Sequence, residues 1–132
     1  MIEHKNVSAF INWCHQEFRE DTFKVLFAGT SICFDLSVFE FFDPLTIGKR
    51  IRILENGLDI NKHLSTEPGI MTNSVPIVIE NLLKEKVDIS NISAINMAGE
   101  SISSFVHQNL DTNRIVVRNL YGPTEDTTYS TI

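Results

Sequence analysis

The sequence predicts an α/β fold with a mainly parallel sheet that is flanked by helices on both faces. Short apolar runs alternate with segments of helical periodicity along all 132 residues. Such alternation requires crossover connections between parallel strands. The hydrophobic fraction of 42% is large enough for a buried core. No repeat, charge block or linker divides the chain, so we expect residues 1–132 to form a single unit.

The first elements are a helix, a strand and a second helix. Residues 9–20 carry apolar side chains four positions apart, which predicts an amphipathic helix behind Ser8 as its cap. Residues 24–29 are a short apolar run, typical of a buried strand. Residues 36–42 are densely apolar and predict a buried helix that Pro44 ends.

The middle of the chain continues the alternation. Residues 50–54 alternate charged and apolar side chains, which is the period of a strand with one wet side. A short helix is expected over residues 59–64, followed by a strand over residues 70–73. Ser74 is expected to cap a helix whose first turn contains Pro76.

Two further strands and a helix complete the pattern. Residues 94–98 and 114–120 are apolar runs that predict strands, and residues 101–110 have the periodicity of a helix between them. In a parallel sheet of this kind, ligands bind at the carboxyl ends of the strands. The segments that follow the predicted strands are therefore the candidates for chemistry.

Charge and motifs exclude several functions. The net charge of -6 argues against a general nucleic-acid or anionic-membrane binder, which needs a basic face. No apolar run reaches the length of a membrane span, and the N-terminus lacks a signal-peptide pattern. The histidines are scattered without zinc-ligand spacing, and no glycine-rich phosphate loop occurs. Cys14 and Cys33 lie in apolar segments, which favours buried thiols in a reducing cytoplasm.

Three segments are candidates for a site. Asp35 lies among apolar residues, where it serves either as a helix cap or as an anchor for a ligand cation such as an ammonium group. Gly99 follows a predicted strand and allows a flat ligand to approach the backbone, or else forms an ordinary turn. Residues 119–125 combine an amide, a phenol, a tight turn, a hydroxyl and a carboxylate, a set suited to a nucleotide and Mg²⁺.

The sequence of these segments resembles adenylation domains of non-ribosomal peptide synthetases. Residues 119–125 (NLYGPTE) are similar to the family motif N-x-Y-G-P-T-E, and residues 34–37 (FDLS) are similar to F-D-x-S. The order and separation of the motifs also fit, and the similarity covers essentially the whole chain. The resemblance implies a flavodoxin-like subdomain of an enzyme that activates an amino acid with ATP, forms an aminoacyl-adenylate and loads a phosphopantetheine carrier domain.

The resemblance also implies a role for each matching residue. Asp35 is expected to bind the substrate ammonium, Tyr121 to stack on adenine beside Asn119, and Glu125 to hold Mg²⁺. The positions that match the substrate pocket are Asp35, Leu36, Phe39, Asn73, Asn96, Ala98, Leu120, Thr128 and Tyr129. The positions that match the nucleotide site are Gly99, Glu100, Asn119, Tyr121, Gly122 and Thr124, with Thr124 and Glu125 as the catalytic pair.

The pocket set predicts a small neutral substrate. No wall residue besides Asp35 carries a charge, so a charged substrate side chain would be desolvated without a partner. The wall set resembles those of alanine-activating domains, which makes alanine the expected substrate.

The resemblance further implies that the chain is a substrate-binding subdomain excised from a larger enzyme and inactive alone. The family's phosphate loop is expected before this segment, and its ribose-binding aspartate and catalytic lysine after it. Three alternatives remain: a fragment of an acyl- or aryl-CoA ligase, which has no ammonium for Asp35 to bind; a non-catalytic α/β binding module; and an exchangeable structural subdomain with exposed apolar patches.

Overall fold

The computed structural model describes residues 2–18 and 22–131 and contains the predicted parallel sheet. Its strand order is β2-β1-β3-β4-β5, and every neighbouring pair is parallel. The strands are β1 (Val25–Ala28), β2 (Arg50–Ile53), β3 (Ile70–Ser74), β4 (Ile92–Ala98) and β5 (Val116–Leu120). The expected fold class is thereby confirmed.

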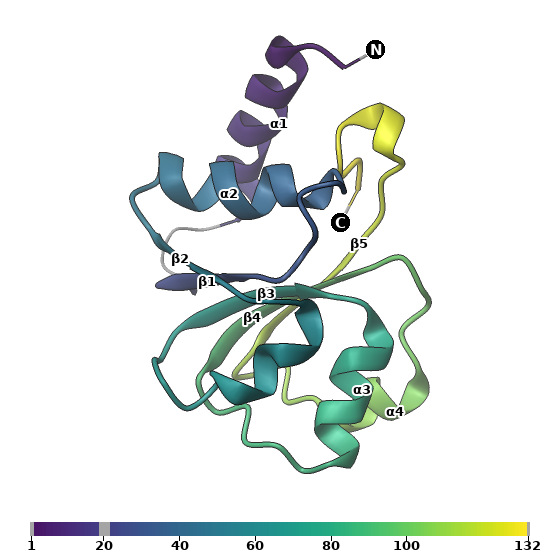
Figure 1. Cartoon of the computed structure of the whole chain (residues 1–132). Coiled ribbons are helices and arrows are strands. Elements are labelled where there is room, and N and C mark those ends of the chain that lie inside the picture. The colour runs from purple at the N-terminus through teal and green to yellow at the C-terminus, as the bar shows by residue number, and fades with distance from the viewer. Residues whose placement is uncertain (1, 19–21, 132) are drawn as a thin grey trace.

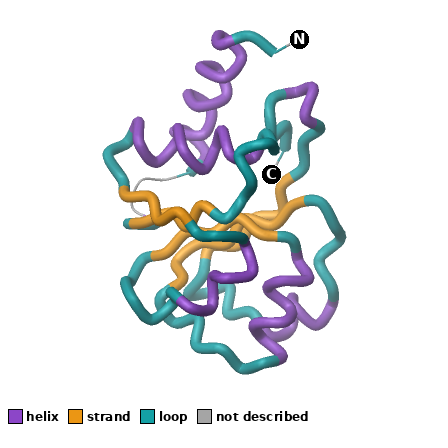
Figure 2. The backbone as a smooth tube through the Cα atoms, viewed as in Figure 1, coloured by secondary structure: helices purple, strands orange, loops and turns teal. Residues whose placement is uncertain are grey.

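Helices cover both faces of the sheet, as Figures 1 and 2 show. On one face lie α1 (His4–Glu17) and α2 (Leu36–Thr46). On the other lie the 3₁₀ helix η2 (Gly57–Lys62), α3 (Pro76–Lys84) and α4 (Ser104–Asn109). No helix in the described part of the chain has both the length and the apolar character needed to cross a bilayer.

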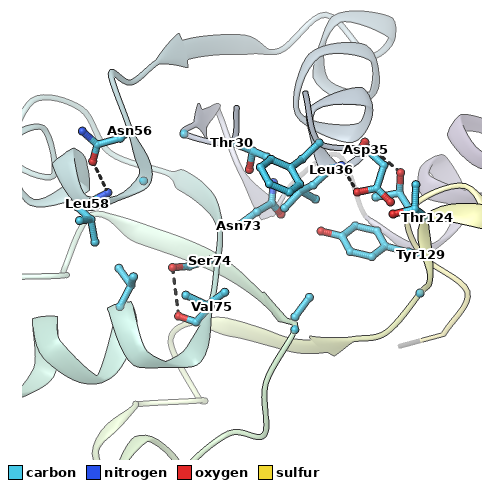
Figure 3. Close-up of a pocket in the computed structure, with 18 residues that line it drawn as sticks. Thr30, Asp35, Leu36, Asn56, Leu58, Asn73, Ser74, Val75, Thr124 and Tyr129 are labelled. Carbon is cyan, nitrogen blue, oxygen red and sulfur yellow. Dashed lines mark hydrogen bonds between the residues drawn. The ribbon is translucent and has the colours of Figure 1, made fainter. Parts of the chain in front are cut away.

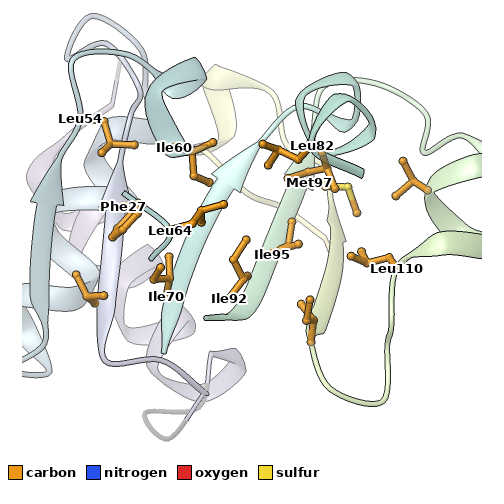
Figure 4. Packing of buried hydrophobic residues seen from close by; sticks show 14 residues of the cluster. Phe27, Leu54, Ile60, Leu64, Ile70, Leu82, Ile92, Ile95, Met97 and Leu110 are labelled. Atoms are coloured by element: carbon orange, nitrogen blue, oxygen red, sulfur yellow. The ribbon is translucent and has the colours of Figure 1, made fainter. Parts of the chain in front are cut away.

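The sheet separates two hydrophobic cores because successive side chains of a strand point to opposite faces. In β1, Val25 and Phe27 join the core beneath η2, α3 and α4 (Figure 4), whereas Leu26 and Ala28 join the core beneath α1 and α2. Burying one such large side chain stabilises the fold by about 1.5–3 kcal/mol. All four residues of β1 are buried, which explains why this strand appears in the sequence as a continuous apolar run.

The order in which strands are added to the sheet reverses at β1. After β1 it crosses by α2 to β2 on one side, and the later strands are then added in order on the other side of β1. The loops that leave β1 and β3 therefore diverge, and this opens a crevice at the carboxyl ends of the two strands. The crevice contains the candidate site.

The first helix begins earlier than predicted. It starts at His4 rather than Ala9, and the Asn6 side chain accepts a hydrogen bond from the Glu3 N–H at 2.8 Å. Ser8, the expected cap, lies inside the helix and donates its hydroxyl to the His4 carbonyl at 3.1 Å. The predicted end at position 20 lies outside the described residues, and α1 ends at Glu17.

The expectation that Pro44 ends the second helix is wrong. Helix α2 continues through Pro44 to Thr46. A proline removes one backbone donor, but the buried face of α2, which includes Phe39 and Asp43, still packs against the sheet. The Thr46 hydroxyl also binds backbone acceptors in the last turn of α2, since it lies 2.9 Å from the Phe42 carbonyl oxygen and 2.8 Å from that of Asp43.

The remaining helix starts also differ from the predictions. Helix α3 has Val75 rather than Ser74 at its N-cap, because Ser74 still pairs within β3. Helix α4 begins at Ser104, where the Ser103 hydroxyl accepts from the Val106 N–H. The predicted short helix over residues 59–64 is the 3₁₀ helix η2, which begins two residues earlier.

Candidate functional site

A pocket of about 640 Å³ opens at the carboxyl ends of the strands. It is lined by the segments that follow all five strands and by the first turn of α2 (Figure 3). The predicted substrate residues that line it are Asp35, Leu36, Asn73, Ala98, Thr128 and Tyr129. The structure therefore brings together residues from four separate segments of the chain.

A second pocket of about 410 Å³ adjoins the first. It contains most of the residues expected to bind the nucleotide, namely Gly99, Glu100, Asn119, Tyr121 and Gly122, together with Leu120. The residues lining both pockets are Ala98, Gly99, Gly122, Thr128 and Tyr129. Two ligand groups bound in the two pockets would meet at this shared wall.

Five predicted site residues lie elsewhere than expected. Leu120, expected in the substrate pocket, lines only the second pocket. Phe39 and Asn96 are buried beneath the first pocket and do not line either one. Thr124 lines the first pocket rather than the second. Glu125 lies on the exposed 3₁₀ turn η3 (Thr124–Asp126), outside both pockets.

Asp35 occupies the N-cap of α2 and also faces the first pocket (Figure 3). Its carboxylate accepts a hydrogen bond from the Leu36 N–H at 2.9 Å, and the residue is half-buried. No lysine or arginine within residues 2–18 and 22–131 forms an ion pair with it. The capping role and the availability of the carboxylate to a ligand are therefore compatible.

The segment after β5 holds the shared wall in a strained conformation. Thr127 and Thr128 have φ angles of 65° and 73°, in the left-handed region that costs a β-branched residue about 1–3 kcal/mol. The Thr128 hydroxyl donates to the Asp35 carbonyl at 3.1 Å, which ties this segment to the first turn of α2. The Ser130 N–H donates to the Tyr121 carbonyl at 2.8 Å and closes the loop.

Tyr129 contributes a buried hydroxyl to the first pocket. Its side chain is 6% exposed, and Figure 3 shows its hydroxyl end directed into the pocket. The hydroxyl has no hydrogen-bond partner among the described residues. Burial, and then the nearby Glu40 carboxyl, raises the pKa of this phenol well above its usual range, so it stays protonated. The hydroxyl is therefore a buried donor without a partner in the wall of the pocket.

Sequence reasoning missed a buried polar network beneath the pocket. Glu40 is completely buried, and it accepts hydrogen bonds from Thr30 and Asn73. Arg118, which is 9% exposed, donates to Asn96 at the other end of the network. A glutamate inside the densely apolar run of residues 36–42 was the available signal, because a buried carboxylate requires partners.

The two cysteines differ in their surroundings. Both thiols are free; Cys14 is buried, but Cys33 is exposed, contrary to the expectation of two buried thiols. Burial and the nearby Asp43 carboxyl raise the pKa of the Cys14 thiol, so it is unreactive. Within the described residues, no group of three or more His, Cys, Asp or Glu side chains is arranged to hold a metal ion.

Comparison with known proteins finds large synthetases that align with nearly the whole chain, although no family model matches it. A linear gramicidin synthase from Brevibacillus parabrevis is 37% identical to it over 132 residues. The AMB antimetabolite synthetase AmbB of Pseudomonas aeruginosa is 35% identical over 133 residues. The alignments cover 98% and 99% of this chain, which spans only 3% and 11% of the lengths of these relatives.

A solved structure has the same arrangement of elements. The Vibrio cholerae adenylation domain AlmE, in complex with glycyl-adenosine-5'-phosphate, matches with a TM-score of 0.78 at 25% identity. The match covers 98% of this chain and 26% of the AlmE chain. The chain is thus similar along its length to segments of peptide synthetases, and its fold is similar to part of an adenylation domain.

Proposed function

Because this chain is a segment of an adenylation domain of the non-ribosomal peptide synthetase type, we propose that its first pocket binds an amino acid and its second pocket binds ATP. The intact domain then forms an aminoacyl-adenylate and pyrophosphate, and transfers the acyl group to a phosphopantetheine thiol on a carrier domain. We place this ATP-dependent reaction in the cytoplasm.

The observation that carries the proposal is the environment of Asp35. Its carboxylate faces the first pocket and lacks a basic partner among the described side chains. A ligand ammonium would supply the missing charge, and a charge-assisted hydrogen bond of this kind is about twice as strong as a neutral one. The Thr128 hydroxyl, through the Asp35 carbonyl, keeps the anchor in place.

The pocket wall favours a small neutral amino acid, and we propose alanine. Apart from Asp35, none of the lining side chains carries a charge. A charged substrate side chain would be desolvated there without compensation. Tyr129 fills volume against Phe39, with ring centroids 5.6 Å apart, and this limits the size of the substrate side chain.

The second pocket suits an adenine nucleotide. The Tyr121 ring is 70% exposed beside Gly99, and both line this pocket with Asn119 and Glu100. Gly99 has a φ of 90°, a conformation that favours glycine and keeps the approach to the backbone open. We assign Tyr121 to stacking on the base, Asn119 and Glu100 to its edges, and Thr124 to a phosphate contact.

The residues present also fit Mg²⁺, provided that the nucleotide supplies the other ligands. Glu125 is exposed and forms no hydrogen bond or ion pair with the described residues. Mg²⁺ is commonly held by one or two carboxylates together with substrate phosphates and water. When bound, the ion offsets the negative charge that develops on the phosphates.

The chemistry requires positioning more than proton transfer. The carboxylate of the amino acid is already ionised at neutral pH, so it needs no general base to attack the α-phosphate. Asp35 orients the ammonium end, and this directs the carboxylate toward the wall that both pockets share. The backbone of Gly99 and Gly122 at that wall allows the two reacting groups to approach closely.

We also propose that residues 1–132 form one subdomain of the larger adenylation domain and do not catalyse the reaction alone. Large apolar side chains are exposed at several loops and edges, which supports packing against other parts of that domain. These side chains include Ile32 at 80%, Phe34 at 66%, Leu45 at 61%, Ile53 at 72% and Leu58 at 70% exposed.

The test is amino-acid-dependent exchange of pyrophosphate into ATP by the intact protein, measured across the common amino acids. We expect alanine to support the fastest exchange. Asp35→Asn should lower kcat/KM for the amino acid about 100-fold or more, because it removes the charge that pairs with a desolvated ammonium. Asp111→Asn, an exposed change outside both pockets, is the matched control.

Two outcomes would contradict the proposal. Exchange that depends on a fatty or aryl acid, with no amino acid active, would favour the CoA-ligase alternative. Unchanged amino-acid selection in Asp35→Asn would remove Asp35 from its assigned role.

A further inference from the structure

A row of hydrogen bonds crosses the sheet directly beneath the first pocket. Asn73, Asn96 and Arg118 occupy paired positions on β3, β4 and β5. Arg118 donates to Asn96 Oδ1 at 3.4 Å, Asn96 Nδ2 donates to Asn73 Oδ1 at 2.9 Å, and Asn73 Nδ2 donates to Glu40 Oε1 at 3.2 Å. Glu40 therefore receives the last hydrogen bond of a row that begins at Arg118.

The two ends of the row determine the direction of every hydrogen bond in it. The Arg118 guanidinium has only donors, and at the other end the Glu40 carboxyl oxygens accept from the Asn73 amide, the Thr30 N–H and the Thr30 hydroxyl. Thr30 likewise acts as a donor to Glu40, since it gives its N–H at 3.0 Å and its hydroxyl at 3.1 Å. Reversing either asparagine amide would set donor against donor or acceptor against acceptor.

We propose that Glu40 is a positioning residue for substrate selection, which it controls by fixing the orientation of Asn73 and Thr30 in the pocket wall. Both of these side chains line the first pocket, whereas Glu40 itself does not. Neither asparagine amide can turn freely to suit a different ligand, because each is held on both sides by the row. The role in selection rests on the proposed function, whereas the direction of the hydrogen bonds does not.

The direction of the row is tested with Glu40→Gln, Asn73→Asp and the double variant, by thermal unfolding of the intact protein. A glutamine at position 40 keeps only one acceptor oxygen, so its NH₂ group must face a donor, either the Thr30 N–H or the Asn73 amide. An aspartate at position 73 faces Glu40 with a second carboxylate. Each single change should lower the unfolding midpoint. The double variant restores donor-to-acceptor pairing, so its midpoint should exceed that of either single variant. Glu85→Gln, an exposed change, is the control.

The comparison of the three variants remains decisive even if a single variant does not fold. In that case, folding of the double variant shows that the second change restores the lost stability. A double variant that is no more stable than the better of the two single variants would overturn the direction of the hydrogen bonds. Pairing across the row predicts a positive coupling between positions 40 and 73.

The role in selection is tested with Glu40→Gln in the pyrophosphate-exchange assay of the intact protein. We expect the ratio of kcat/KM for the preferred amino acid over its nearest competitor to fall about tenfold, with the KM for ATP unchanged. An unchanged ratio in a folded variant would limit Glu40 to stabilising the fold. If the unmodified protein activates no amino acid at all, the proposed function fails, and the thermal cycle still decides the direction of the row.

Discussion

At the scale of single residues, Asp43 is the least satisfied charge in the described part of the structure. It is completely buried between α1 and α2, and both of its carboxylate oxygens lack a hydrogen-bond partner within the described chain. The nearest basic group is His15, whose Nε2 lies 3.9 Å from Oδ1. Burial raises the pKa of Asp43 from its ordinary value near 3.8 to about 7.

This raised pKa predicts a pH dependence of stability. The folded state holds the Asp43 proton between about pH 4 and pH 7, whereas the unfolded state releases it. Its contribution is therefore favourable below pH 4 and is lost as the pH rises to 7, by at most about 4 kcal/mol for a shift of about three units. Asp43→Asn should remove this loss.

The measurement is urea unfolding of the wild type and Asp43→Asn at pH 5 and pH 8. The difference in unfolding free energy between the two proteins should favour the variant more strongly at pH 8 than at pH 5. A difference that does not change with pH would show that Asp43 is not protonated in the folded state at pH 5.

At the scale of elements, the segment after β5 depends on one glycine. A Cβ placed on Gly122 would lie 2.7 Å from the Tyr129 Cα and 2.8 Å from the Ser130 N, and it would also contact the Thr128 carbonyl oxygen. These contacts involve backbone atoms, which cannot move aside as a flexible side chain can. The wall shared by the two pockets therefore requires glycine at this position.

Gly122→Ala should displace this segment while the sheet remains folded. We expect amino-acid affinity and nucleotide affinity to fall together, since Thr128 and Tyr129 line both pockets. Binding titrations with each ligand on the intact protein measure this. Gly48→Ala, outside both pockets, is the control for backbone strain alone, because its φ of 70° disfavours a side chain although a Cβ there meets no atom within 4 Å. Retention of both affinities in Gly122→Ala would contradict the prediction.

The elements also show what the sequence could and could not predict. The strands and the parallel sheet follow from apolar runs, because β1 is buried on both faces and has no alternation to detect. The predicted helix starts were less accurate, since the capping box of Glu3 and Asn6 forms through local side-chain contacts that several nearby polar residues could equally make.

The candidate site also contains residues that the sequence could predict and residues that it could not. Motifs directed attention to Asp35 and Tyr121, which line the two pockets, because each prediction depends on a short segment of sequence. The network of Glu40 and Arg118 was missed because it depends on strand register, which pairs Asn73 with Asn96 and Asn96 with Arg118. Register is a property of the assembled sheet, and the composition of single strands does not reveal it.

At the scale of the whole molecule, stability should decrease from the centre of the sheet to its edges. Strand β3 pairs with β1 and β4, whereas β2 pairs only with β1 and leaves Ile53 72% exposed. Hydrogen exchange of the 132-residue chain should therefore be slowest in β3 and β4 and fastest, among the strands, in β2. Equal protection of β2 and β3 would contradict this order.

The row from Arg118 to Glu40 also constrains how the first pocket could change during evolution. Replacing Asn96 leaves Arg118 without its partner in the row, and replacing Asn73 removes one of the three hydrogen bonds that Glu40 accepts. An unsatisfied buried group costs about 1–3 kcal/mol. Transplanting the segment from Thr30 to Arg118 as a block carries donor and acceptor together. Recombination of the whole segment should therefore alter the pocket at a smaller loss of stability than a succession of single mutations.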